Sequence, residues 1–134
     1  MLPGATGAHK DRLMKRCMFV DDSSVVRKVA KRILGSPELI VIEASTGAEA
    51  LDMCQHDMPD IIVVDSVLPD MTAVEFIQRA RGIPSEVKPQ IVLCLVEVDV
   101  GAIMRAKRAG AQGYLLKPFN RAQLLERFRQ LQAA

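Results

Sequence analysis

The sequence predicts an α/β fold, in which helices cover both faces of a doubly wound, five-stranded parallel sheet. Two observations of the sequence and one general rule predict it. Short apolar runs alternate with segments of helical periodicity along the chain. The run Ile61 to Val64 is apolar without alternation, which is typical of a strand covered on both faces. Strands that alternate with helices form parallel sheets, because each helix carries the chain back to the same end of the sheet.

Length and composition indicate one compact domain. The chain has 134 residues, of which 49% are hydrophobic and 25% charged. We expect residues 1–13 to form a tail outside the fold and residues 14–134 to form the domain. A formal net charge of +2 is too small to indicate a nucleic acid or a membrane surface as the partner. The three cysteines form no CxxC pair and favour a reducing compartment, the cytoplasm.

The first strand is expected at Cys17 to Val20, a short apolar run. A helix from Ser23 to Leu34 follows, because its apolar residues recur at helical spacing and its first serines are good N-caps. The sequence Gly35-Ser36-Pro37 ends this helix, since glycine and proline interrupt helical backbone. The second strand is expected at Leu39 to Ile42.

The second helix opens at Thr46-Gly-Ala-Glu49, which has the pattern of a capping box. The third strand, Ile61 to Val64, follows it. Another capping box, Thr72-Ala-Val-Glu75, opens the third helix. The fourth strand is expected at Ile91 to Val96, the next apolar run along the chain.

The last three elements complete the alternation. The segment Val100 to Ala109 is predicted as a helix that ends at Gly110, a residue suited to the helix C-terminus. Tyr114 to Leu116 forms a short fifth strand, and Asn120 caps the last helix.

Charged residues stand at the ends of three predicted strands. Asp21 and Asp22 follow the first, Asp65 the third and Lys117 the fifth. Ligands of such sheets bind beyond the carboxyl ends of the strands, so these side chains are candidates for one site. A single aspartate would most simply cap the next helix, but three carboxylates with an ammonium favour a site. Carboxylate ligands without His or Cys suit a hard cation such as Mg²⁺.

Three motifs, in this order and spacing, resemble those of the bacterial response-regulator receiver domain of the single-domain chemotaxis type. They are MFVDDSSVVRKV, DIIVVDSVLPDM and AGAQGYLLKPF. The resemblance covers Met14 to Leu131 and implies a flavodoxin-like receiver fold with five helices. The strand order 2-1-3-4-5 is implied by this resemblance alone, because the alternation of strands and helices leaves the order open.

The resemblance also implies a role for each residue of the acidic edge. Asp65 would accept a phosphoryl group from a phosphohistidine on a histidine kinase or phosphotransfer protein. Asp22 would bind Mg²⁺ directly and Asp21 largely through water, while Asp65 and the backbone carbonyl of Val67 would complete the protein's share of the ligands. Lys117 would pair with the carboxylate and then with the phosphoryl oxygens.

A cis peptide between Lys117 and Pro118 is implied as well, since X-Pro bonds are the ones that adopt cis geometry at low cost.

The chemistry of phosphoryl transfer agrees with this set of residues. A carboxylate that attacks phosphorus needs a metal and an ammonium to neutralise the charge on the equatorial oxygens.

The sequence departs from the family at the end of the fourth strand. Leu95 stands where the family has Thr or Ser, and Val96 stands at the small residue after it. In the family this hydroxyl binds a phosphoryl oxygen, and its movement lets the aromatic residue of the fifth strand, here Tyr114, turn inward. Leu95 has no hydrogen-bond donor. We favour a phosphorylated receiver with an altered switch; the alternatives are a phosphorylation-insensitive adaptor and a module that binds a nucleotide second messenger.

The last third of the chain is rich in arginine and lysine. A solvated helix face is the simpler interpretation of this pattern. The functional interpretation is a partner-binding face that includes Arg105, Arg108, Tyr114 and Arg121. We expect a monomer or weak dimer that signals by protein contacts. We expect no DNA-binding domain, no membrane segment and no enzymatic activity beyond slow self-dephosphorylation.

Two other classes of protein with related chemistry fit the residues less well. A flavodoxin would need a Ser/Thr/Gly phosphate loop after the first strand, where Asp21 and Asp22 would repel a phosphate. An aspartyl phosphatase of the haloacid dehalogenase type would need a second aspartate two residues after Asp65, and that position is Val67.

Overall fold

The computed structural model describes residues 15–133, so the tail predicted at residues 1–13 lies outside the described residues. Strands and helices alternate along the described chain. In order they are β1 (Lys15–Val20), α2 (Ser24–Leu34), β2 (Leu39–Ala44), α3 (Gly47–His56), β3 (Ile61–Asp65), α4 (Ala73–Gly82), β4 (Gln90–Leu95), α5 (Val100–Ala109), β5 (Gly113–Leu116) and α6 (Arg121–Ala133).

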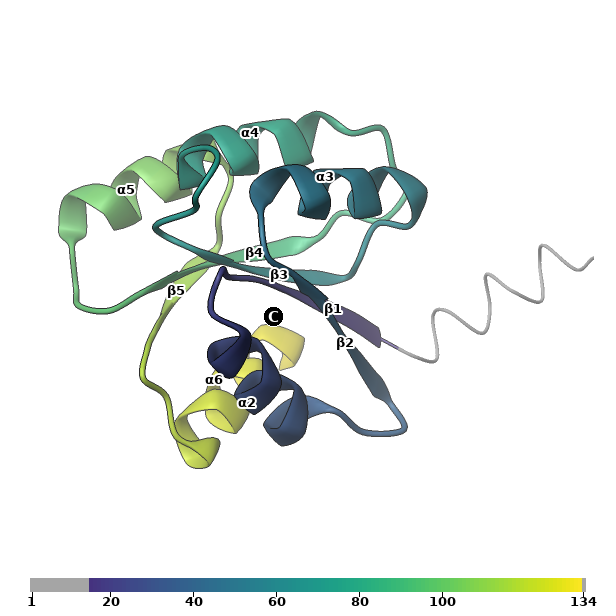
Figure 1. Ribbon diagram of the computed structural model, residues 1–134, viewed down its shortest axis with the longest axis vertical. Coiled ribbons are helices and arrows are strands. Elements are labelled where there is room, and N and C mark those ends of the chain that lie inside the picture. The colour runs from purple at the N-terminus through teal and green to yellow at the C-terminus, as the bar shows by residue number, and fades with distance from the viewer. Residues whose placement is uncertain (1–14, 134) are drawn as a thin grey trace, which may run out of the picture.

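The five strands form one parallel sheet in the order β2-β1-β3-β4-β5, which confirms the predicted fold. Helices α3, α4 and α5 cover one face of the sheet, and α2 and α6 cover the other (Figure 1). The direction of winding reverses between β1 and β3, which are paired at the centre of the sheet. The carboxyl ends of these two strands are therefore where the fold places a ligand.

Two hydrophobic clusters, one on each face, hold the layers together. Because successive side chains of a strand point to opposite faces, Met18 and Val20 join the cluster under α3, α4 and α5, whereas Phe19 joins the cluster of α2 and α6. Phe19 stacks on Phe128 of α6 with the ring centroids 6.3 Å apart. Every residue of β3 is buried, as its unbroken apolar run predicted.

Local capping explains where the helices begin. The hydroxyl oxygens of Thr46 and Thr72 accept from the backbone N–H groups three residues later, each at 3.0 Å. The glutamates complete neither box in the expected way. Glu49 accepts from the N–H of Ser45 instead of Thr46, and Glu75 forms an ion pair with Arg79 one turn along α4.

The fourth strand is one residue shorter at its end than predicted. It ends at Leu95, and the Val96 side chain lies in the following loop with 70% of its surface exposed. The apolar run of the sequence extends one residue beyond the strand. The last paired residue of β4 is Leu95, which lies opposite Leu116.

The three cysteines are free and buried, which for Cys17 and Cys94 agrees with their positions in apolar runs. Burial raises the pKa of Cys54 to about 11 and that of Cys94 to about 12, so both thiols stay protonated and behave as small core hydrophobes. No helix within residues 15–133 has the length and apolar character needed to cross a bilayer.

Candidate functional site

Three carboxylates meet at the carboxyl edge of the sheet. Oxygen atoms of Asp21, Asp22 and Asp65 all lie within 4.8 Å of one another. The strand register explains the contact between Asp21 and Asp65, because Val20 pairs with Val64 and an aspartate follows each of these valines in the chain. Asp21 and Asp65 are buried, at 2% and 5% exposed, whereas Asp22 faces solvent.

Lys117 lies between the two buried carboxylates. Its Nζ atom is 2.8 Å from Oδ2 of Asp21 and 3.1 Å from Oδ2 of Asp65. The backbone N–H of Lys117 donates to the carbonyl of Leu95 at 2.9 Å, and the peptide bond to Pro118 is cis. The ammonium is thus fixed by carboxylates at the ends of β1 and β3, and the backbone that carries it is bonded to β4.

The electrostatics of this group are unbalanced. Burial and the nearby charge of Asp21 raise the pKa of Asp65, although Lys117 and the backbone N–H of Val67 act in the opposite direction. Burial alone would lower the pKa of Lys117, but its hydrogen bonds to Asp21 and Asp65 outweigh burial and raise it. One ammonium faces three carboxylates, which leaves negative charge uncompensated at this edge.

A hard divalent cation fits the residues present. The donors are carboxylate oxygens, the chemistry that Mg²⁺ prefers, and they lie close enough together to share one ion. The exposed side of Asp22 leaves the site open to the solvent waters that Mg²⁺ normally retains.

Removal of the Asp65 charge should stabilise the metal-free protein. The folded state raises the pKa of Asp65 above its ordinary value of 3.8, so folding favours the protonated carboxyl. The free energy of unfolding therefore falls as the pH rises from the ordinary pKa through the raised one. Lys117 keeps Asp21 as its partner in Asp65→Asn. We therefore expect Asp65→Asn to unfold at a higher urea concentration than the wild type at pH 7 in EDTA.

The advantage should shrink as pH is lowered, because the wild-type carboxyl then takes up its proton and the two proteins become alike. An Asp65→Asn variant that is less stable than the wild type at pH 7 would show that pairing with Lys117 outweighs the cost of burial.

Arg27 and Glu43 support the site from α2 and β2. The Nη1 atom of Arg27 donates to the backbone carbonyl of Asp21 at 2.6 Å, and its Nε atom donates to Glu43 at 3.1 Å. Hydrogen bonds from Lys28 and Arg27 hold the pKa of Glu43 below its ordinary value. Sequence reasoning missed this pair, because the helical pattern of α2 places Arg27 on a face without naming its partner.

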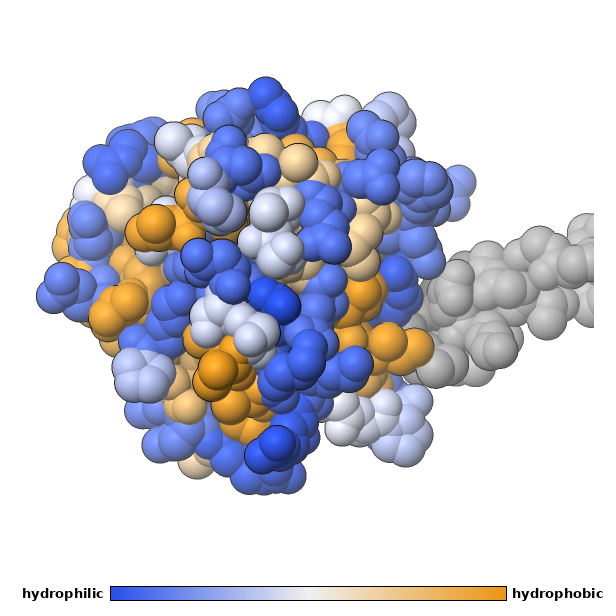
Figure 2. Space-filling view, in the orientation of Figure 1, coloured by the Kyte–Doolittle hydropathy of each residue, from blue (hydrophilic) through white to orange (hydrophobic). Residues whose placement is uncertain are grey.

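Exposed valines stand on the connections that follow β3 and β4. Val67, two residues after Asp65, has 73% of its surface exposed, and its backbone pairs with Thr72 across the loop. Val96, Val98 and Val100 of the β4–α5 connection are also exposed. Figure 2 shows apolar side chains on the surface around this connection, at the left of the view.

Leu95 is a core residue here. It is 3% exposed and belongs to the cluster under α4 and α5, against which Tyr114 also packs. Tyr114 lies opposite Leu93, and Leu116 lies opposite Leu95, so Leu95 and Tyr114 are diagonal neighbours on the same face of the sheet. The guanidinium carbon of Arg127 stands 5.6 Å from the centre of the Tyr114 ring.

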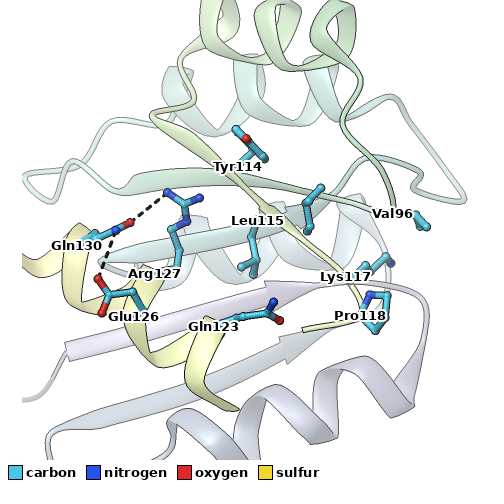
Figure 3. Close-up of a pocket in the computed structure, with 10 residues that line it drawn as sticks. Val96, Tyr114, Leu115, Lys117, Pro118, Gln123, Glu126, Arg127 and Gln130 are labelled. Carbon is cyan, nitrogen blue, oxygen red and sulfur yellow. Dashed lines mark hydrogen bonds between the residues drawn. The ribbon is translucent and has the colours of Figure 1, made fainter. Parts of the chain in front are cut away.

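A pocket of about 490 Å³ opens between β5 and α6 (Figure 3). Tyr114, Lys117 and Arg127 line it, and Gln130 links Arg127 to Glu126 by hydrogen bonds.

The other residues of the expected partner face do not line this pocket. Arg105 and Arg108 are on α5, and both are exposed. Arg121 lines a separate groove with Ile33 and Leu34 of α2. Arg127, which was not among the residues expected on the partner face, contacts the Tyr114 ring.

Comparison with known proteins agrees with this geometry. The response regulator receiver domain family matches residues 17–129. The chemotaxis protein CheY of Halobacterium salinarum is 28% identical over 114 residues, which cover 85% of this chain and 93% of that protein. The response regulator MprA of Mycobacterium tuberculosis is 36% identical over 116 residues, covering 87% of this chain but 50% of that protein. The structure of chemotaxis response regulator CheY4 of Vibrio cholerae superposes with a TM-score of 0.82 at 30% identity, covering 88% of this chain and 98% of that one.

Proposed function

This chain belongs to the response regulator receiver domain family, the receivers of two-component signalling, and on that premise we propose that Asp65 accepts a phosphoryl group from a phosphohistidine donor. The observation that carries the proposal is the pairing of a buried carboxylate with Lys117 at 3.1 Å, beside two further carboxylates. The donor would be a histidine kinase or a phosphotransfer protein in the cytoplasm.

Asp21, Asp22 and Asp65, with the backbone carbonyl of Val67, would hold Mg²⁺. The ion would neutralise charge on the phosphoryl oxygens during transfer. Asp22 suits direct ligation because it faces solvent, whereas Asp21 already accepts from Lys117 and from the N–H of Ser23.

Asp65 and Lys117 have different roles in the transfer. A carboxylate oxygen of Asp65 attacks phosphorus, the P–N bond of the donor breaks, and the imidazole keeps the electron pair and takes a proton. Lys117 changes partner from the Asp65 carboxylate to the transferred phosphoryl oxygens, and its bond to Asp21 keeps the ammonium in place meanwhile. The protein acts as an acceptor and a signal, with at most slow self-dephosphorylation.

The output of this receiver would differ from that of relatives with a hydroxyl at the end of β4. Leu95 offers no donor to the phosphoryl group and fills core space beside Tyr114. The same observation favours a second candidate function, an adaptor that binds its partner without regard to phosphorylation. The intact charged group supports the first candidate more strongly than the buried leucine supports the second.

Incubation with acetyl phosphate and Mg²⁺, followed by intact-mass measurement, tests the proposal. We expect one added phosphoryl group on the wild type and none on Asp65→Asn. The reason is that an amide oxygen is a poor nucleophile and Asp65 is the proposed acceptor next to Lys117. Equal labelling of both proteins would place the acceptor elsewhere, and an unlabelled wild type that remains folded would favour the adaptor.

A further inference from the structure

The loop between β3 and α4 is tied to the start of α3 by one side chain. Asp70 accepts two hydrogen bonds, from the N–H of Gly47 at 3.0 Å and from the N–H of Ala48 at 2.9 Å. Both are amides of the first turn of α3, which have no partner inside the helix. These two bonds hold the pKa of Asp70 below its ordinary value, so the side chain is a carboxylate at neutral pH.

This contact is additional to the ordinary cap of α3. Thr46, the N-cap residue, already accepts from the N–H of Glu49. Asp70 lies 23 residues from Gly47 in sequence, so its two bonds join separate parts of the chain as well as completing the helix end. A carboxylate at this position is further favoured by the positive end of the helix dipole.

Close packing beside Asp70 reinforces the attachment. A Cβ atom at Gly47 would lie 2.7 Å from the Sδ atom of Met71, so glycine leaves the room that the Met71 side chain occupies. Met71 in turn packs against the hydrophobic cluster under α3, α4 and α5. The loop is therefore held by a polar contact and an apolar contact to the same helix end.

The attached loop is the one that carries Val67. Its first residue, Ser66, donates its N–H to the carbonyl of Cys94 at 2.7 Å, and Val67 pairs with Thr72 across the loop. The Val67 side chain itself is exposed. The orientation of its backbone therefore depends on the fixed points of the loop, among which Asp70 makes the polar attachment to the start of α3.

We propose that Asp70 is a positioning residue for the phosphoryl-transfer site, acting by holding the β3–α4 loop so that the carbonyl of Val67 faces the acidic group. This rests on the proposed function, in which that carbonyl is a metal ligand. Mg²⁺ requires near-octahedral geometry with short ligand distances, so a carbonyl that turns away weakens binding. The exposed Asp70 side chain thereby takes part in metal binding without touching the metal.

Four variants separate this role from helix capping. Asp70→Ala removes both accepted bonds, and Asp70→Asn keeps one acceptor oxygen. Thr46→Ala removes a capping bond from the same helix end but leaves the loop attached. Asp22→Ala removes a proposed ligand and sets the limit of no binding. For each protein we would measure the Mg²⁺ dissociation constant by NMR titration, the urea midpoint, and amide hydrogen exchange of the loop without metal.

We expect Asp70→Ala to bind Mg²⁺ about tenfold more weakly, the lower end of the range for groups that orient metal ligands. Asp70→Asn should lie between Asp70→Ala and the wild type. Thr46→Ala should lose stability but keep the wild-type dissociation constant. In the metal-free protein, the amides of Val67 and Met71 should exchange faster in Asp70→Ala than in Thr46→Ala.

Equal Mg²⁺ affinity in Asp70→Ala and the wild type would overturn the positioning role, and Asp70 would then be a helix cap only. An equal weakening in Thr46→Ala and Asp70→Ala would overturn it as well, since stability alone would account for the effect. A wild-type protein that binds no Mg²⁺ would instead overturn the metal site of the proposed function, so the two failures are distinguishable.

Discussion

Replacement of Lys117 by methionine will lower the free energy of unfolding at neutral pH by about 3 kcal/mol when no divalent cation is present. Removal of one partner from a buried ion pair costs about 3–5 kcal/mol, because the other charge stays buried without compensation. Here two buried carboxylates, Asp21 and Asp65, lose the same ammonium. The lower end of the range applies, because 15% of the lysine side chain is exposed and Asp65 can take up a proton.

Urea denaturation in EDTA measures this loss, and two controls identify its cause. The double variant Asp65→Asn with Lys117→Met should recover part of the stability, because it removes one of the two uncompensated carboxylates. Added Mg²⁺ should also recover stability in Lys117→Met, since the cation replaces the missing positive charge. A Lys117→Met protein as stable as the wild type in EDTA would contradict the account of the site as an excess of buried negative charge.

The same variant should transfer phosphoryl groups poorly even where Mg²⁺ restores its stability. The ammonium is the group that follows the phosphoryl oxygens in the proposed mechanism, and methionine has no donor. Slow labelling by acetyl phosphate in a fully folded Lys117→Met protein would therefore separate the catalytic contribution of Lys117 from its structural one.

Addition of beryllofluoride and Mg²⁺ to the wild type will leave the environment of Tyr114 nearly unchanged. A hydrogen bond to a charged group contributes roughly 1.5–3 kcal/mol, and Leu95 supplies none to a phosphoryl mimic. A ligand shifts a conformational equilibrium only by its differential affinity for the two states, so loss of a contribution of this size can hold the switch in one state. NMR shifts of Tyr114 and of α5, before and after addition, measure the effect.

Two substitutions of similar shape give the matched comparison. Leu95→Thr introduces a hydroxyl, and Leu95→Val removes a similar volume from the core without one. Both will lose stability, because Leu95 is 3% exposed in a packed cluster. Only Leu95→Thr should show beryllofluoride-dependent shifts at Tyr114. Large shifts across β5 and α5 in the wild type would mean that Leu95 does not uncouple the switch and that another group carries the signal.

The sequence alone was sufficient for features that depend on short-range pattern. The apolar runs predicted the five strands, and the threonines at positions 46 and 72 predicted helix starts that the structure confirms. These features are predictable because a capping bond spans three residues and a strand is recognised by its own composition. The strand order came from the resemblance to the family, and the structure confirms it.

The convergence of the acidic residues could also be predicted from the sequence. Once the strands are parallel and Asp21 and Asp65 end two of them, the fold itself brings the carboxyl ends to one edge. The charge balance at this edge could not be predicted from the sequence. The raised pKa of Asp65 depends on how deeply the surrounding chain buries it and on where Lys117 lies.

Only the tertiary structure decided which side chains meet across different elements. Arg27 bonds to the Asp21 carbonyl, Asp70 bonds to the first amides of α3, and Arg127 lies over the Tyr114 ring. Periodicity assigns a residue to a face of its own helix but names no partner on another element, such as the amide of Gly47 that Asp70 binds from 23 residues away. Such partners are chosen by the packing of whole elements against one another, because the distance between two side chains on different elements is set by the side chains that fill the space between them.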